Sequence, residues 1–247
     1  MNYIAQIREA AELIRESAHC YCLTGAGMST ESGIPDFRSP GGLWQEIAPI
    51  KTSSAEVLYN NPRVFYEVAF TRFARITRAE PNAGHSSLAR LEQMGYLKGL
   101  VTQNIDGLHV KAGSQRVWEV HGHLRSGYCL GCQKRYPFEF LVEQVERQQI
   151  PPSCPSCNHM LRPDVVLFGD PMPPLFYEAW EELAGQCDLL LVCGSSLVVY
   201  PVAELPALAR KLIIINLEPT PYDHLAAVVI REKCGKVLPA IVELLEA

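Results

Sequence analysis

The sequence predicts an α/β fold, a parallel sheet between helices, with a smaller discontinuous domain inserted into it. Short β-rich runs alternate with helical patterns along most of the chain, as they do in βαβ units. Most β-rich runs are apolar throughout, as expected of strands that are covered on both faces. Residues 39–79 and 123–162 interrupt the alternation, so we expect them to form the smaller domain. Residues 1–38, 80–122 and 163–247 then make up the larger domain.

The individual elements follow from apolar patterning. An amphipathic helix is predicted at the start of the chain from apolar residues at helical spacing: Ile4, Ile7, Ala11 and Ile14. Strands are predicted at the apolar runs 19–24, 98–102, 117–120, 188–193 and 211–216. Further helices are predicted over 83–94, 138–147, 201–210 and 237–246. Gly95 ends the first of these, since glycine commonly terminates helices.

The composition is that of a globular protein. Of the 247 residues, 48% are hydrophobic and 20% are charged, a balance that excludes a disordered chain. The net charge of −5 argues against nucleic-acid binding as the main task, because that task needs a basic surplus. The longest uncharged stretch, between Asp188 and Glu204, is shorter than the ~20 apolar residues of a membrane span. We expect no membrane segment and no direct nucleic-acid binding.

Four of the nine cysteines form two closely spaced pairs, Cys129-x-x-Cys132 and Cys154-x-x-Cys157. Two such turns close a tetrahedral zinc site, and four thiolates leave no position for a catalytic water. The alternatives are a redox dithiol or a chance pairing. The odd number of cysteines fits poorly with a full set of disulfides. We therefore predict structural zinc and a reducing, cytoplasmic location.

Polar or glycine-containing segments follow all five predicted strands. They are Gly25-Ala26-Gly27, Gln103-Asn104-Ile105-Asp106, His121-Gly122, Gly194-Ser195-Ser196 and Asn216-Leu217-Glu218. The carboxyl ends of parallel strands share one edge of the sheet, and ligands bind in the crevice there. The sequence thus predicts a ligand site built from these segments.

The first segment resembles the start of a dinucleotide fingerprint, although Thr30 stands where a third glycine belongs and a plain tight turn is the alternative. Glu218 follows Gly194 at roughly the ~20-residue separation at which an acid meets a ribose hydroxyl. His121 shares the crevice edge with Asn104 and Asp106, and a neutral imidazole is a suitable general base for a hydroxyl. A purely structural histidine is the alternative. No Gly-x-Ser-x-Gly nucleophile motif is present.

Together these motifs resemble the signature of the sirtuins, the NAD-dependent protein lysine deacylases. The resemblance spans roughly residues 18–243 and is greatest with compact bacterial and archaeal members. Besides the segments above and the four cysteines, it rests on Gly33-Ile34-Pro35-Asp36-Phe37-Arg38 and Phe168-Gly169. It implies a Rossmann-like NAD-binding domain, a small domain with a helical and a zinc module, and an acyl-lysine peptide bound between them.

The resemblance also implies residue roles. His121 is the base, and Asn104 and Asp106 line the nicotinamide and ribose pocket. The residues implied in NAD binding are Gly25, Ala26, Gly27, Ser29, Asp36, Phe37, Arg38, Gln103, Asn104, Ile105, Asp106, Gly194, Ser195, Ser196, Asn216, Leu217, Glu218 and Cys234. Those implied to flank the substrate backbone, in strand-like segments, are Val166, Leu167, Phe168, Gly169, Leu197, Val198 and Val199. Cys129, Cys132, Cys154 and Cys157 hold the zinc.

The function predicted is NAD-dependent deacetylation of protein lysines, by a chain that we expect to be a monomer. An NAD-dependent mono-ADP-ribosyltransferase and a non-catalytic NAD-sensing module are alternatives, as is a deacylase of longer or acidic acyl groups. Members that prefer succinyl groups carry Tyr-x-x-Arg, where this chain has Tyr66-Glu67-Val68-Ala69. The missing arginine predicts a preference for acetyl groups, unless Arg72 or Arg75 reaches the pocket.

Overall fold

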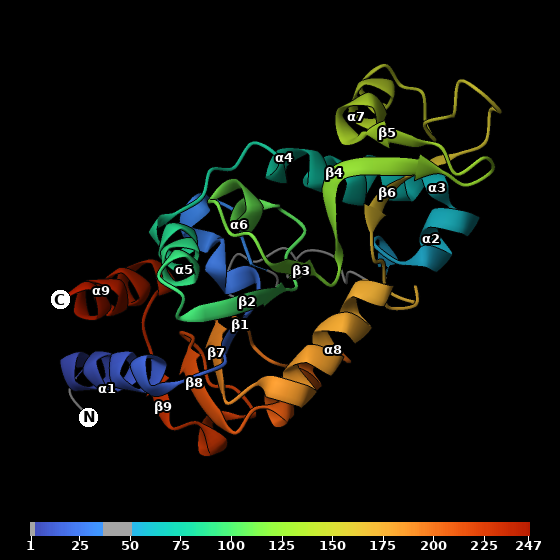
Figure 1. The fold of residues 1–247 in the computed structure, drawn as a ribbon. Coiled ribbons are helices and arrows are strands. Elements are labelled where there is room, and N and C mark those ends of the chain that lie inside the picture. Colours follow the sequence, from blue (N-terminus) through green and yellow to red (C-terminus); the bar gives the residue numbers. More distant parts are fainter. Residues whose placement is uncertain (1–2, 37–50) are drawn as a thin grey trace.

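The computed structural model describes residues 3–36 and 51–247 (Figure 1). Its larger sheet has six parallel strands in the order β3-β2-β1-β7-β8-β9. These strands are β1 Cys20–Thr24, β2 Leu97–Thr102, β3 Val117–Glu119, β7 Leu189–Cys193, β8 Lys211–Ile215 and β9 Val228–Ile230. The first five agree with the predicted strands to within one residue at each end. The three-residue edge strand β9 is too short to give a pattern in the sequence.

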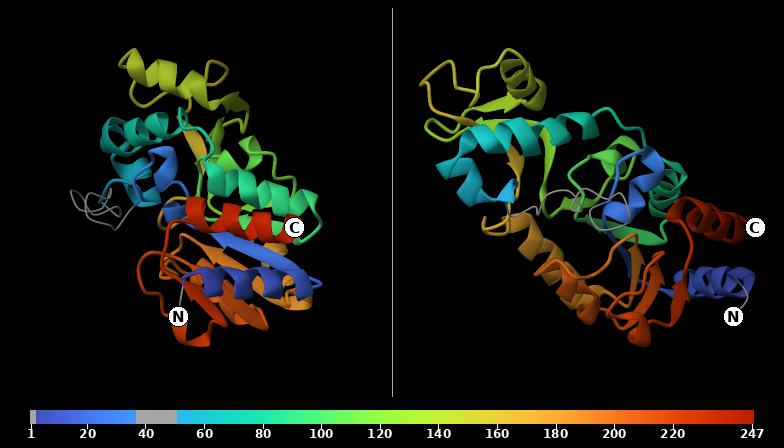
Figure 2. Two further views of the ribbon diagram at one scale, coloured as in Figure 1. Left: turned by 90° about the vertical axis from the view of Figure 1, so that its left-hand side faces the viewer. Right: turned by 180° about the vertical axis from the view of Figure 1, so that it is seen from behind.

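Helices cover both faces of this sheet, which confirms the predicted fold class. On one face lie α1 Tyr3–Glu16, α5 Ala83–Gln93 and α9 Cys234–Glu246, and the left view of Figure 2 shows α1 and α9 in front of the strands. On the other face lie α8 Pro174–Gln186 and the 3-10 helix Val202–Leu208. Successive residues of β1 point to opposite layers, Cys20 to the first and Tyr21 to the second.

The structure corrects two of the predicted helices. Within the predicted helix 201–210, the residues Val202–Leu208 form a 3-10 helix and not an α-helix. Pro206 lies inside it and has no N–H to donate, which disfavours regular α-helical bonding. The last helix begins at Cys234, earlier than predicted. Helix α8 and the short helix α6 Leu108–Lys111 have no counterpart in the sequence predictions.

The second sheet is antiparallel, with β4 Gly122–Cys129 between β5 Arg135–Pro137 and β6 Leu161–Val165. Helix α7 Phe138–Glu146 packs on it. The other inserted stretch is helical and comprises α2 Ala55–Asn60, α3 Pro62–Val64, a π-helical turn Phe65–Phe70 and α4 Thr71–Ile76. Both stretches share one hydrophobic core, in which the rings of Phe70 and Phe138 lie 5.0 Å apart.

This second core reaches beyond the predicted boundaries of the smaller domain, because Ile105, Val165 and Leu167 also pack in it. Two segments far apart in sequence thus form one hydrophobic unit beside the parallel sheet (Figure 1). None of the helices in the described part of the chain is long and apolar enough to cross a bilayer.

Candidate functional site

A cavity of about 780 Å³ lies where β1, β2, β7 and β8 end. The helical insertion contributes Ser53, Phe73 and Ile76 to its wall, so the cavity lies between the parallel sheet and the second hydrophobic core. All five segments predicted at the strand ends supply residues to this wall. Parallel topology therefore brings together groups that are far apart in the sequence, such as Gly25 and Glu218, which are separated by 193 positions.

Most of the predicted ligand-binding residues line this cavity. They are Gly25, Ala26, Gly27, Ser29, Asp36, Gln103, Asn104, Ile105, Asp106, His121, Val166, Leu167, Phe168, Gly169, Gly194, Ser195, Ser196, Val199, Asn216, Leu217, Glu218 and Cys234. Phe37 and Arg38 lie outside the described residues. Two predicted substrate residues do not line it. Leu197 has a φ of 53° and its side chain is buried in the core, whereas Val198 is exposed.

Several residues of the wall have no counterpart in the sequence predictions: Thr30, Ile34, Pro35, Ser53, Phe73, Ile76, Val165, Asp170, Met172, Tyr200, Pro201, Glu232 and Lys233. Most follow from the packing of the helical insertion and of the turns after β6 and β7, for which the sequence carries no local signal. Thr30, Ile34 and Pro35 are exceptions, because they belong to motifs described above, although they were not among the predicted site residues.

The two segments predicted to flank the substrate backbone as strands are not strands in the structure. Residues 166–169 and 196–199 follow β6 and β7 as irregular backbone. Phe168 makes one isolated bridge to Ser54, and the Val166 N–H donates to the carbonyl oxygen of His121 at 2.9 Å. One of these segments is therefore bonded directly to the backbone of the predicted base.

Glycine is required where the first and fourth segments meet. A side chain on Gly25 would lie 2.8 Å from the Gly194 carbonyl oxygen, and one on Gly27 would lie 2.9 Å from the Gly194 Cα. Gly194 itself has a φ of 62°, and a Cβ there would lie 2.2 Å from the Met28 nitrogen. The Gly27 N–H donates to the Gly194 carbonyl oxygen at 2.9 Å. These backbones touch directly, so there is no room for a side chain between the two segments.

A network of hydrogen bonds fixes the polar groups beside this contact. The Asn104 amide donates to the Gly25 carbonyl oxygen at 3.0 Å and to the Ser29 hydroxyl at 3.1 Å. Ser29 in turn donates to Asp106 Oδ2 at 2.7 Å. Burial raises the pKa of Asp106, and the bonds from the Leu108 N–H and from Ser29 partly offset this. The network ties the second segment to the first and holds the Asn104 and Asp106 side chains in place at the wall.

His121 is held in one tautomer. Its Nδ1 lies 3.0 Å from the Gln103 carbonyl oxygen. A carbonyl oxygen only accepts, so Nδ1 carries the proton and Nε2 keeps its lone pair. Burial lowers the pKa of His121 below the usual 6.5, and the bond to Gln103 opposes this shift only in part. The imidazole is therefore neutral at pH 7, as a general base must be.

The far end of the cavity is polar. The Asn216 side-chain amide donates to the Glu218 carbonyl oxygen at 2.7 Å. Cys234 lies at the start of α9, and its sulfur is 3.7 Å from the Ile215 carbonyl oxygen. The Gln103 side chain extends toward this end, and its amide donates to the Ser195 hydroxyl at 2.8 Å. The wall thus has an apolar part beside Phe73 and a polar part after β7 and β8.

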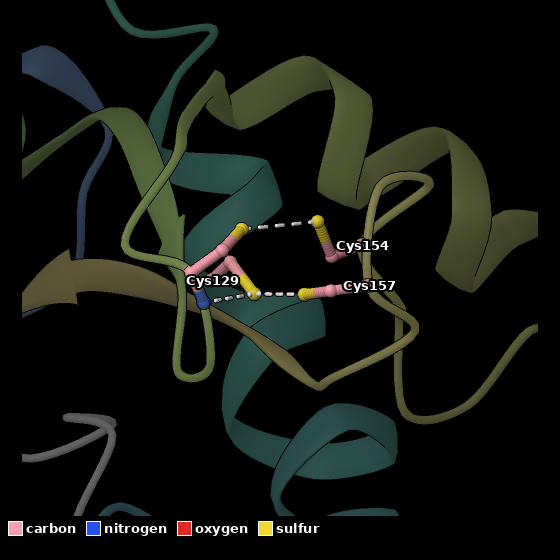
Figure 3. A group of neighbouring side chains, drawn as sticks. Cys129, Cys154 and Cys157 are labelled. Carbon is pink, nitrogen blue, oxygen red and sulfur yellow. Dashed lines mark hydrogen bonds between the residues drawn. The ribbon is translucent and has the colours of Figure 1, made fainter.

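The two Cys-x-x-Cys turns meet at the tip of the small sheet (Figure 3). The sulfurs of Cys129 and Cys157 lie 3.3 Å apart, and those of Cys132 and Cys154 lie 3.7 Å apart. All four sulfurs lie within 4.8 Å of one another. Zinc bound tetrahedrally at about 2.3 Å places its sulfur ligands roughly 3.8 Å apart, so the four thiolates fit this metal.

The three side chains considered for acyl recognition, those of Tyr66, Arg72 and Arg75, do not line the cavity. Tyr66 is fully buried in the second core and donates to the Leu161 carbonyl oxygen. Arg72 and Arg75 do not line the cavity, although Phe73 and Ile76 of the same helix do. Among the described residues, Lys233 is the single lysine or arginine in the wall.

Comparison with known proteins points to one family. The model of the Sir2 family matches residues 25–201. The chain is 53% identical over 241 residues to "NAD-dependent protein deacetylase 2" of Caldanaerobacter subterraneus subsp. tengcongensis, an alignment that covers 97% of this chain and 96% of the relative. It is 46% identical over 244 residues to "NAD-dependent protein deacylase 2" of Archaeoglobus fulgidus, with 96% and 95% covered.

Solved structures agree over the whole fold. A structure described as "Structural Basis for the Mechanism and Regulation of Sir2 Enzymes" superposes with a TM-score of 0.89 at 44% identity and covers 98% of both chains. The complex "Sir2-p53 peptide-NAD+" superposes with a TM-score of 0.88 at 37% identity, covering 96% of this chain and 98% of the other. On the evidence of the family model, the full-length relatives and the shared fold, this chain belongs to the Sir2 family.

Proposed function

We propose that this protein is an NAD-dependent protein lysine deacetylase. Acyl-lysine, NAD and water are consumed, and lysine, nicotinamide and O-acyl-ADP-ribose are formed. The observation that carries the proposal is the neutral, proton-accepting Nε2 of His121 in the same cavity as the glycine contact and the Asn104–Ser29–Asp106 network. A dinucleotide site and a base thus share one cavity.

The roles of the residues follow from their places in the wall. The glycine segments would hold the pyrophosphate of NAD with backbone N–H groups, because their direct contact fixes the backbone at the ends of β1 and β7. Asn216, Glu218 and Cys234 would hold the adenosine half at the polar end. Asn104 and Asp106 would face the nicotinamide ribose, where His121 Nε2 accepts a proton from a ribose hydroxyl. The neutral amide of acyl-lysine is a poor electrophile, so NAD would supply the electrophile, which is its ribose carbon.

The peptide would lie between the two hydrophobic units, with residues 166–169 and 196–199 flanking its backbone. The described wall beside Phe73, Ile76, Ile105 and Val166 is apolar, which suits an uncharged acyl group. The four cysteines would hold a structural zinc that ties the two turns of the small sheet together.

The predicted organisation of the chain belongs to the same proposal. The NAD-binding domain comprises residues 1–38, 80–122 and 163–247, and the small domain comprises 39–79 and 123–162. The location is a reducing compartment, the cytoplasm, because an odd number of cysteines fits poorly with a full set of disulfides. The chain is expected to be a monomer.

Nicotinamide release tests the proposal. The purified chain is incubated with NAD, with and without an acetyl-lysine peptide, and a matched peptide with unmodified lysine is the control. Release that requires the acetyl group is expected. Release without peptide, together with transfer of labelled ADP-ribose to protein, would instead indicate the transferase. Binding of NAD with no release would indicate a sensing module.

A further inference from the structure

The 165–170 loop, which begins with the last residue of β6, forms one side of the cavity, and each of its residues lines the wall. Its backbone is fixed at several points. The Phe168 N–H donates to the Ser53 carbonyl oxygen at 3.3 Å, and the Ala55 N–H donates to the Phe168 carbonyl oxygen at 2.9 Å. With the bond from Val166 to His121, these contacts hold the loop between the helical insertion and the base.

One buried guanidinium lies behind this loop. The Arg162 side chain is only 5% exposed and comes from β6, with Asp170 at the opposite end of the loop. Arg162 Nη2 donates to Asp170 Oδ2 at 2.6 Å, and Nη1 lies 3.3 Å from Oδ1, so the pair is bidentate. Nη2 also donates to the Val165 carbonyl oxygen at 3.1 Å.

The same charge pair reaches the middle of the loop and the neighbouring elements. Asp170 Oδ2 accepts from the Leu167 N–H at 2.9 Å. Arg162 Nη1 donates to the Tyr59 hydroxyl of α2 at 3.1 Å, and its guanidinium lies 5.7 Å from the centre of the Tyr128 ring. Both ends and the centre of the loop are therefore bound to one ion pair, which is itself anchored on α2 and β4.

Stability alone does not account for such a pair. Burying two charges costs desolvation energy, and apolar residues of similar volume are often equally stabilising. A guanidinium differs from apolar groups because its planar set of N–H donors binds its partners in a fixed geometry. Arg162 does not line the cavity, so its side chain can influence ligand binding only through the loop that it holds.

We propose that Arg162 is a positioning residue, which through its pair with Asp170 holds the 165–170 loop in the shape that receives the acyl-lysine peptide. The proposal rests on the proposed function, because it assigns the peptide to this side of the cavity. It assigns no contact with NAD to Arg162, so peptide binding and NAD binding should respond differently to its loss.

The test uses two variants and a matched control in the full chain. Asp170→Asn removes the charge and keeps the shape, and Arg162→Lys keeps the charge and removes the fork. The control is Asp164→Asn, since Asp164 also pairs with an arginine, Arg135, and its side chain is 15% exposed against 14% for Asp170. Asp164 lies on β6 and does not line the cavity.

We expect the KM for an acetyl-lysine peptide to rise about tenfold to a hundredfold in Asp170→Asn, the range of a lost charged hydrogen bond. The KM for NAD should stay within about twofold of the wild-type value, and Arg162→Lys should show the same split to a smaller extent because it retains the charge. Asp164→Asn should change neither KM. If Asp170→Asn fails to fold, as seen in its thermal melting, Arg162→Lys carries the test.

An unchanged peptide KM in a folded variant would overturn the proposal. Equal rises of both KM values, or the same rise in the control, would overturn it as well, because the pair would then have only a general structural role. A wild-type chain that releases no nicotinamide would instead contradict the proposed function. In that case the affinity of each variant for a fluorescent acetyl-lysine peptide still decides the role of Arg162, and a wild type that binds no peptide refutes it.

Discussion

Replacing Gly194 by alanine should weaken NAD binding while the chain stays folded. The new Cβ would lie 2.2 Å from the Met28 nitrogen and 2.5 Å from the Gly27 carbonyl carbon, whereas real Cβ contacts essentially never fall below 3.0 Å. The two glycine segments must therefore separate by most of an ångström. That movement breaks the bond from the Gly27 N–H to the Gly194 carbonyl oxygen and displaces the backbone that would receive the pyrophosphate.

The cost to stability can be worked out from two contributions. An alanine at a φ of 62° is strained by about 1–2 kcal/mol, and the lost backbone hydrogen bond adds about 1 kcal/mol. For a chain of this size each kcal/mol lowers Tm by about 2–4 °C, so a fall of roughly 5–10 °C is expected. The variant should remain folded at 25 °C, and its KM for NAD should rise at least about tenfold, as expected for losing 1.4 kcal/mol of binding.

Gly95→Ala is the matched control. Gly95 has a φ of 81° and nothing within 4 Å of the Cβ position, so alanine there adds strain without a clash. It should lower Tm by about 2–8 °C and leave the KM for NAD unchanged. Thermal melting and initial-rate kinetics on both variants give the comparison. Wild-type NAD affinity in a folded Gly194→Ala protein would refute the assignment of the glycine contact to the pyrophosphate.

Three further predictions concern the base, the metal and the acyl group. His121→Ala should lower kcat by ~10²–10⁴-fold while NAD binding persists. Because the neutral imidazole is the active form and burial lowers its pKa in the free chain, wild-type kcat/KM should fall only as the pH drops below 6.5, and a midpoint above 6.5 would contradict this. Cys129→Ser should lose about one zinc per chain, measured by metal analysis, and should lower Tm; a zinc-free protein of normal stability would show that the metal is not structural. Matched peptides should give a kcat/KM at least about tenfold higher for acetyl-lysine than for succinyl-lysine, because the described residues of the wall include no arginine for a carboxylate. A succinyl preference would show that another cation serves the pocket.

The polar parts of the site are predictable from the sequence because of topology. Gly25, Gln103, His121, Gly194 and Asn216 each follow an apolar run, and a parallel sheet places the ends of such runs at one edge. The cysteine turns are equally local, since two residues between thiolates fix the geometry of each half-site. Strand boundaries agreed for the same reason, as fully buried strands are uniformly apolar.

The parts that escape prediction depend on contacts between distant elements. Arg162 and Asp170 look like ordinary surface charges in the sequence, and only the turn after β6 makes them a buried pair. Leu197 lies in the predicted substrate segment, but its positive φ turns the side chain into the core. Tyr66 matches a family motif by position, although the π-helical turn that contains it buries the ring away from the cavity.

Product stoichiometry tests the central claim most directly. The chain is incubated with an acetyl-lysine peptide and NAD, and the products are counted by mass spectrometry, with His121→Ala as the control. If the chain is the proposed deacetylase, nicotinamide, deacetylated peptide and O-acetyl-ADP-ribose should form in equal amounts, with none formed without NAD and a large loss of all three in the variant. Deacetylation without NAD, or ADP-ribose attached to protein in place of the acetylated product, would contradict the proposal.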